Sequence, residues 1–149
     1  MLEEELMRIA RNHPRKMAVR IGFDEKLAHL IEAGADCFLM PSRFEPCGLN
    51  QMYSQCYGTP PLVHGTGGLL DTVVDCTPES LADGTATGFV FHDLTPEAFL
   101  GTLERTVATY RDKPGWRRLM RNGMVQDFSW RASAADYRKI YLSLLSQKR

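Results

Sequence analysis

The chain has 149 residues, of which 44% are hydrophobic, and this is enough to bury the core of one compact domain. Its 18 basic residues balance its 18 acidic residues without forming a basic cluster, so binding to nucleic acid or to an anionic membrane is not expected. The four cysteines form no C-x-x-C pair and no apolar run is long enough to span a membrane, which predicts a soluble cytoplasmic protein without structural zinc or disulfides.

The first half of the chain alternates between helical and β-prone patterns. Apolar residues at helical spacing predict a helix over 2–13, and the β-prone run 17–21 predicts a strand. Asp24 is a suitable N-cap for a second helix, whose C-terminal cap would be Gly34. The apolar run 37–40 lacks period-two alternation, so it predicts a strand that is covered on both faces.

The second half continues this alternation. The expected elements are a helix over 48–57, a strand over 62–64, a short helix over 69–74, a strand over 88–91, and helices that start at Thr95, at Gly115 and after Ser129. The polar segment 76–87 is predicted to be a surface loop. Strands that alternate with helices predict an α/β fold, a Rossmann-like parallel sheet with flanking helices, in which ligands bind beyond the carboxyl ends of the strands.

The segment 41–53, with the sequence PSRFEPCGLNQMY, carries the most chemical information. It places a carboxylate (Glu45), a thiol (Cys47) and a glycine (Gly48) between the end of a predicted strand and the start of a predicted helix. A helix start offers unpaired N–H groups and the positive end of the helix dipole, so it can hold a diphosphate without lysine or metal. Each residue alone has a structural interpretation, as a solvated acid, a small apolar side chain or a turn residue.

The whole run from Ser42 to Tyr53 resembles the signature of bacterial glycogen synthases and plant starch synthases, which are GT-B glycosyltransferases. The resemblance continues through segments 57–60, 66–73, 86–89 and 127–130, so it covers nearly the whole chain. It implies that residues 1–149 are a single, partial nucleotide-sugar-binding domain, part of the C-terminal domain of a GT-B enzyme.

The resemblance also implies roles for particular residues. Glu45 would be the catalytic carboxylate that lies beside the donor glucose and binds its hydroxyls. The helix start at Gly48 and Leu49 would hold the diphosphate, and Asn50 would reach a phosphate or the ribose. Wider GT-B enzymes carry a second glutamate at the position of Tyr53. Glycogen synthases have a tyrosine there, as this chain does. Cys47 together with Tyr53 therefore favours ADP-glucose over other donors.

Two further positions belong to the implied donor site. Phe23 stands where the family usually has an aromatic residue that stacks on adenine, although a core phenylalanine at a strand end is a competing interpretation. In the turn 65–68, Thr66 and Gly67 would let the backbone approach the donor phosphates. His29 and His64 are interpreted as structural. No cofactor and no metal are expected.

The family transfers glucose from ADP-glucose to the 4-hydroxyl at the non-reducing end of an α-1,4-glucan, with retention at the anomeric carbon. An N-terminal domain that binds the glucan, and upstream cations that neutralise the diphosphate, are both absent from this sequence. We therefore expect the isolated chain to be inactive. We also expect incomplete sheet edges and the C-terminal helix to promote self-association.

Three other interpretations remain open on sequence alone. In the first, the chain is a non-catalytic interaction or regulatory module derived from such a domain. In the second, it belongs to a GT-B enzyme that uses another donor, such as UDP-glucose or GDP-mannose. The third is a thiol hydrolase that uses Cys47 with His64, for which no third orienting residue stands out.

Overall fold

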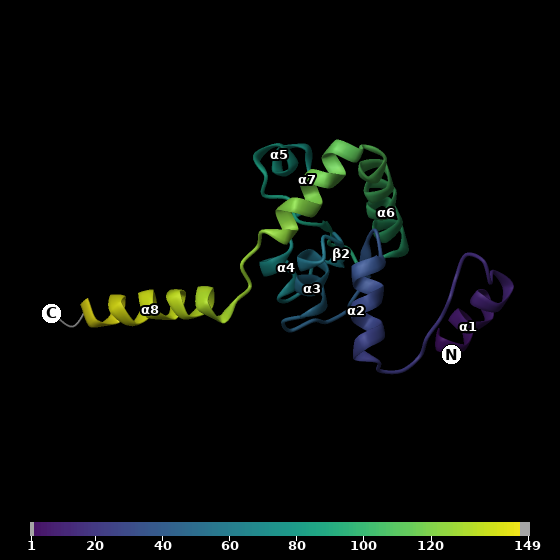
Figure 1. Ribbon diagram of the computed structural model, residues 1–149, viewed down its shortest axis with the longest axis horizontal. Helices are drawn as coiled ribbons and strands as arrows, with labels where there is room; N and C mark the ends of the chain where they lie inside the picture. The colour runs from purple at the N-terminus through teal and green to yellow at the C-terminus, as the bar shows by residue number, and fades with distance from the viewer. Residues whose placement is uncertain (1, 147–149) are drawn as a thin grey trace.

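The computed structural model describes residues 2–146, which form an α/β body with a helix extending from it at each end (Figure 1). In chain order the elements are α1 (Leu2–Asn12), α2 (Glu25–Gly34), β1 (Phe38–Met40), α3 (Asn50–Cys56), β2 (Pro61–His64), α4 (Leu69–Thr72), α5 (Pro78–Asp83), β3 (Phe89–Phe91), α6 (Pro96–Arg111), α7 (Lys113–Met124) and α8 (Trp130–Ser146).

The three strands form a parallel sheet in the order β1-β2-β3, as the alternation of patterns predicts. The central strand β2 is buried along its length, and its successive side chains enter different clusters. Leu62 packs with Phe89 and with Trp116 of α7, and Val63 packs with Leu69 of α4. Helices therefore cover both faces of β2, the arrangement expected from the sequence for the run 37–40.

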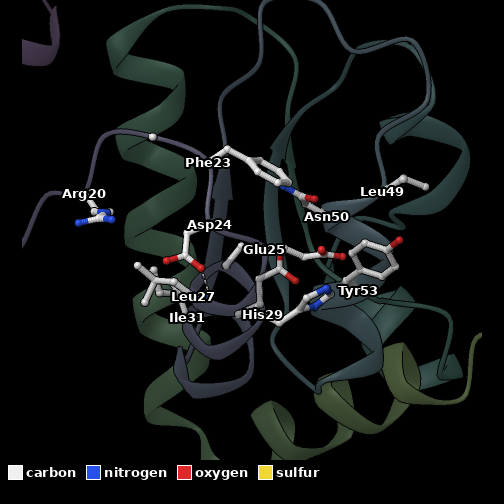
Figure 2. Close-up of a pocket in the computed structure, with 13 residues that line it drawn as sticks. Arg20, Phe23, Asp24, Glu25, Leu27, His29, Ile31, Leu49, Asn50 and Tyr53 are labelled. Atoms are coloured by element: carbon white, nitrogen blue, oxygen red, sulfur yellow. Dashed lines mark hydrogen bonds between the residues drawn. The ribbon is translucent and has the colours of Figure 1, made fainter.

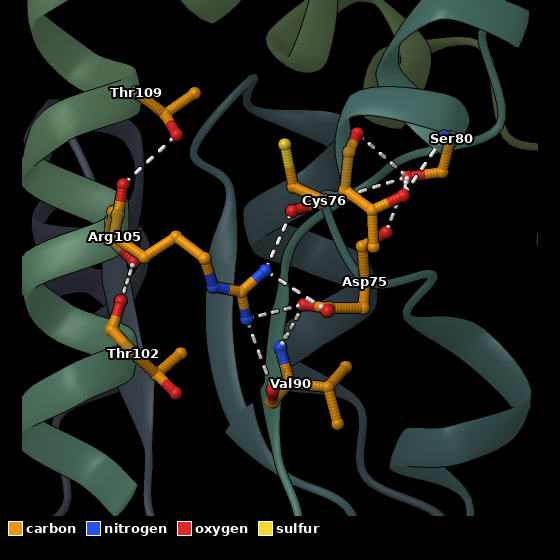
Figure 3. A network of polar contacts seen from close by, with 9 residues as sticks. Asp75, Cys76, Ser80, Val90, Thr102, Arg105 and Thr109 are labelled. Atoms are coloured by element: carbon orange, nitrogen blue, oxygen red, sulfur yellow. Dashed lines mark hydrogen bonds and ion pairs between the residues drawn. The ribbon is translucent and has the colours of Figure 1, made fainter.

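An ion pair joins the segment before α5 to helix α6 (Figure 3). The guanidinium of Arg105 in α6 donates to both carboxylate oxygens of Asp75, at 3.0 and 2.9 Å. It also donates to the backbone carbonyls of Cys76 at 2.6 Å and Val90 at 3.3 Å, while the Val90 N–H donates to Asp75 at 2.8 Å. One side chain thus joins the segment before α5, strand β3 and helix α6.

The structure differs from three of the expected elements. Residues 17–21 form no strand, because β-prone residues need a neighbouring strand and none of the described strands pairs with them. The run 37–40 is not covered on both faces, since β1 lies at the edge of the described sheet and Leu39 is 44% exposed. The segment 76–87 is not a loop throughout: it contains α5, whose start is fixed by the capping box of Thr77 and Ser80.

The two outer helices contribute little to the core. Neither α1 nor α8 has a buried residue, and α8 leaves the body after α7 (Figure 1). Trp130 at the start of α8 is 88% exposed. No helix among residues 2–146 combines the length and apolar character needed to cross a bilayer.

Candidate functional site

A cleft of about 430 Å³ lies between α2 and α3 and brings together residues from separate parts of the chain (Figure 2). Its lining comprises Arg20, Gly22, Phe23, Asp24, Glu25, Leu27, Ala28, His29, Ile31, Glu32, Leu49, Asn50 and Tyr53. Four of the nine predicted site residues therefore share one cleft: Phe23, Leu49, Asn50 and Tyr53.

Phe23 is presented to this cleft by the turn that precedes α2. Gly22 has a φ of 129°, and Asp24 caps α2 by accepting a hydrogen bond from the Leu27 N–H at 3.0 Å. Phe23 is 95% exposed, so the interpretation as a core phenylalanine is wrong. An exposed aromatic ring beside a cleft offers a flat apolar surface on which a heteroaromatic ligand can stack.

The walls of the cleft are held together by aromatic contacts. The His29 ring of α2 lies 5.3 Å from the Tyr53 ring of α3, measured between centroids. Its Nδ1 is 3.2 Å from the hydroxyl of Tyr57. His29 thus fixes α2 against α3, which agrees with its interpretation as a structural residue.

The loop before α3 carries the predicted catalytic acid. Glu45 is half-buried, and its Oε2 accepts a hydrogen bond from the Ser42 hydroxyl at 3.3 Å. Gly48 has a φ of 74°, a value that L side chains rarely adopt, and no side chain caps α3. The loop is secured by Gln51, whose amide donates to the carbonyls of Cys47 and Gly48, each at 3.1 Å.

The glycine turn before α4 packs directly against this loop. The Gly68 N–H donates to the carbonyls of Glu45 at 3.3 Å and Pro46 at 3.1 Å. A Cβ at Gly68 would lie 2.5 Å from the Cys47 carbonyl oxygen, and one at Gly67 would overlap the Glu45 carbonyl. These glycines have a packing role that the sequence did not reveal. The packing places Gly67 beside Glu45 and places Gly68 beside Cys47.

Sequence reasoning missed Glu32. The apolar residues Leu27, Leu30 and Ile31 recur at helical spacing and are expected to form the inner face of α2, but Leu30 is 61% exposed and Ile31 is 52% exposed. Glu32 is instead 3% exposed, and its Oε2 is buried without a hydrogen-bond partner. Burial raises the pKa of this carboxyl, and the nearby charge of His29 opposes that rise.

We expect Glu32→Gln to stabilise the chain at neutral pH by about 1 kcal/mol, because it removes the cost of burying an unpaired charge. The folded pKa lies above the ordinary value of 4.5, so this cost is present at neutral pH and is lost as the pH falls through the raised pKa towards 4.5. Urea denaturation at pH 7 and at pH 4 measures the difference. Glu104→Gln on exposed α6 is the control, and an equal gain for Glu32→Gln at both pH values would contradict the assignment.

The thiol-hydrolase interpretation receives no support from the geometry. The two ring nitrogens of His64 face backbone carbonyls, Nδ1 at 2.7 Å from Ser42 and Nε2 at 3.2 Å from His92. Cys47 is an exposed free thiol. His64 therefore fixes the loop that carries Glu45. Residues 2–146 contain no cluster of three or more histidine, cysteine or acidic side chains suited to a metal ion.

Comparisons with known proteins agree with this architecture. Residues 3–113 match the family of glycosyl transferases group 1. The chain is 92% identical over its full length to a glycogen synthase of Nitrosospira multiformis, and 62% identical over 99% of its length to a glycogen synthase of Nitrosomonas eutropha. It spans 30% and 29% of the length of those two relatives.

Two solved structures share the fold. The catalytic domain of starch synthase IV from Arabidopsis thaliana, bound to ADP and acarbose, superposes with a TM-score of 0.80 at 37% identity; the match covers 96% of this chain and 30% of that one. Sucrose-phosphate synthase from Thermosynechococcus elongatus matches with a TM-score of 0.65 at 22% identity, over 97% of this chain and 34% of that one, and shows the fold alone. By its fold and its sequence the chain belongs to the group 1 glycosyl transferases, and within them it is similar to the C-terminal part of glycogen and starch synthases.

Proposed function

We propose that this chain is the donor-binding part of a glycogen synthase, which transfers glucose from ADP-glucose to the non-reducing end of an α-1,4-glucan with retention. The observation that carries the proposal is the shared cleft, in which Phe23 lies together with Leu49, which precedes α3, and with Asn50 and Tyr53 of α3. The high identity to glycogen synthases, and a similar starch synthase structure that is bound to ADP and acarbose, support it.

In this proposal the ligand extends from the cleft to the loop before α3. Adenine stacks on the exposed ring of Phe23, and Asn50 reaches the ribose or a phosphate. The backbone at Gly48 and Leu49 binds the diphosphate. The contact between the 65–68 turn and the 45–47 loop supports a common surface for Cys47, Thr66 and Gly67 beside the donor phosphates.

Glu45 would bind the hydroxyls of the glucose, with its orientation maintained by Ser42. Retaining transfer develops positive charge at the anomeric carbon and negative charge on the departing ADP. Hydrogen-bond donors aimed at the diphosphate therefore lower the barrier most, and the carboxylate of Glu45 favours the positive centre. The proposal assigns no metal to the donor site.

The proposal predicts that ADP binds to the purified chain more tightly than UDP, because the larger purine stacks better on Phe23. Phe23→Ala should weaken ADP binding about tenfold, the effect expected from losing one stacking ring. Calorimetric titration measures both affinities. Trp130→Ala, which removes an exposed aromatic ring from α8 outside the cleft, is the matched control and should leave the affinity unchanged.

The result that would sink the proposal is a folded chain that binds neither nucleotide, or one whose ADP affinity is the same with and without the Phe23 ring. Glu45→Ala should leave ADP binding intact, since Glu45 is assigned to the glucose.

We expect no incorporation of glucose from ADP-glucose into glycogen by this chain alone, because the acceptor glucan would bind to parts found in the longer relatives. A radiolabel incorporation assay tests this, with the whole Nitrosospira multiformis enzyme as positive control. Measurable turnover by the 149-residue chain would contradict the division of roles.

The remaining partners also belong to this proposal. The glucan is bound through an N-terminal domain of the whole enzyme, and the enzyme works in the cytoplasm, where four free cysteines stay reduced. Self-association through the exposed α8 surface stays a prediction, and sedimentation across a range of concentrations measures it.

A further inference from the structure

Three buried side-chain atoms among the described residues lack a hydrogen-bond partner: Glu32 Oε2, Gln51 Oε1 and Gln55 Oε1. The two glutamines have an evident structural role, because their amide nitrogens donate to Thr72, at 3.1 Å from Gln51 and 2.9 Å from Gln55. They link α3 to α4, and in each of them the side-chain oxygen receives no hydrogen bond. Glu32 is different, because it lines the cleft between α2 and α3.

An unpaired buried carboxyl is costly to the fold. Burying such a group without a partner lowers the free energy of unfolding, whereas an apolar side chain of similar size would not lower it. A buried polar group of this kind calls for a partner that the chain itself does not supply, such as a ligand, an ion or an ordered water. The free oxygen of Glu32 is therefore best explained by a ligand donor that reaches it from the cleft.

The surroundings define the chemistry of that donor. The cleft has apolar walls at Leu27, Ile31 and Leu49, and an exposed aromatic ring at Phe23. This apolar part of the lining suits a flat heteroaromatic base. Among the nearby polar groups, Asp24 is occupied as the cap of α2 and His29 is bound to Tyr57. Glu25 and Asn50 also line the cleft, but both are exposed to water. Glu32 Oε2 is the buried acceptor of the lining whose missing partner an amino group on the base would have to supply.

We propose that Glu32 selects the nucleobase, its free carboxylate oxygen accepting a hydrogen bond from the exocyclic amino group of adenine. The inference rests on the proposed nucleotide-binding function, and adds a specificity-determining residue to it. Hypoxanthine carries a carbonyl oxygen in place of this amino group, and uracil carries one at the corresponding position, so neither can donate to the carboxylate from there. A site that loses a buried hydrogen bond in this way discriminates strongly against the wrong ligand.

The test compares ADP with inosine diphosphate, which has the same sugar, phosphates and ring system but a carbonyl in place of the amino group. The chain should bind ADP at least about tenfold more tightly, as expected for a hydrogen bond to a charged group. Glu32→Met should bring the two affinities to within about twofold by weakening ADP alone. Glu104→Met makes the same chemical change on exposed α6 and should keep the preference.

Unfolding curves separate binding from folding, since Glu32→Met should be at least as stable as the natural chain. A folded Glu32→Met chain that keeps its preference for ADP overturns the inference, as does one that loses ADP and inosine diphosphate in parallel. Both results leave the proposed function intact, because ADP still binds the natural chain. If the natural chain binds neither nucleotide, the proposed function fails as well.

Discussion

Gly68→Ala is expected to destabilise the chain by about 3 kcal/mol and to abolish nucleotide binding, because the new methyl group has no space. Its Cβ would lie 2.5 Å from the Cys47 carbonyl oxygen and 2.7 Å from the Cys47 Cα. Both are backbone atoms, so the loop that carries Glu45 has to move, and overpacking of this kind costs up to about 3 kcal/mol. Chemical denaturation and titration with ADP measure the two effects.

This substitution isolates the contact from backbone strain. Gly68 has φ −64° and ψ −9°, which alanine adopts freely. Gly101 in α6 offers the matched control, because it is also helical and nothing lies within 4 Å of its added Cβ. Gly101→Ala should stabilise the chain by up to about 1 kcal/mol. Equal effects of the two substitutions would show that the 65–68 turn does not support the Glu45 loop.

Arg105→Met should cost about 2–4 kcal/mol of unfolding free energy, the second large effect that we expect. Arg105 makes two hydrogen bonds to Asp75 and one each to the carbonyls of Cys76 and Val90, and its removal leaves these partly buried acceptors without it (Figure 3). Arg105→Lys should recover little of the loss, because one ammonium cannot match the planar fork of the guanidinium.

The control for Arg105→Met is Lys139→Met. Lys139 forms an ion pair with Asp136 at 2.8 Å on the exposed surface of α8, and such a pair contributes less than about 1 kcal/mol. Urea denaturation of both variants compares a network with an isolated pair. A loss at Arg105 no larger than that at Lys139 would mean that the network does not hold β3 to α6.

Local signals in the sequence predicted most of the fold. Apolar runs located β1, β2 and β3, and capping residues such as Asp24 and Thr95 marked helix starts at the correct positions. The failures occurred where a partner decides the outcome. Residues 17–21 have strand-forming composition but no strand beside them, and the buried face of α2 depends on where α3 packs rather than on where the leucines fall.

The candidate site was predicted less completely than the fold. The motif around Glu45 and Gly48 is local, so it could be recognised from the chain itself, and the cleft brings Phe23 together with Leu49, Asn50 and Tyr53. Glu32 could not be recognised, because a glutamate on a surface helix ordinarily faces water. Only the packing of α2 against its neighbours shows that this carboxyl is buried. The contact of Gly68 with Cys47 also depends on the folded structure, so the sequence alone could not predict it.

The central claim is that ADP binds in the cleft between α2 and α3, and an NMR titration of the ¹⁵N-labelled chain tests it most directly. Addition of ADP should shift the amide signals of 22–25 and 48–53, from opposite sides of the cleft, and leave those of α8 in place. Shifts confined to α5, α7 or α8, with 22–25 and 48–53 unmoved, would contradict the account.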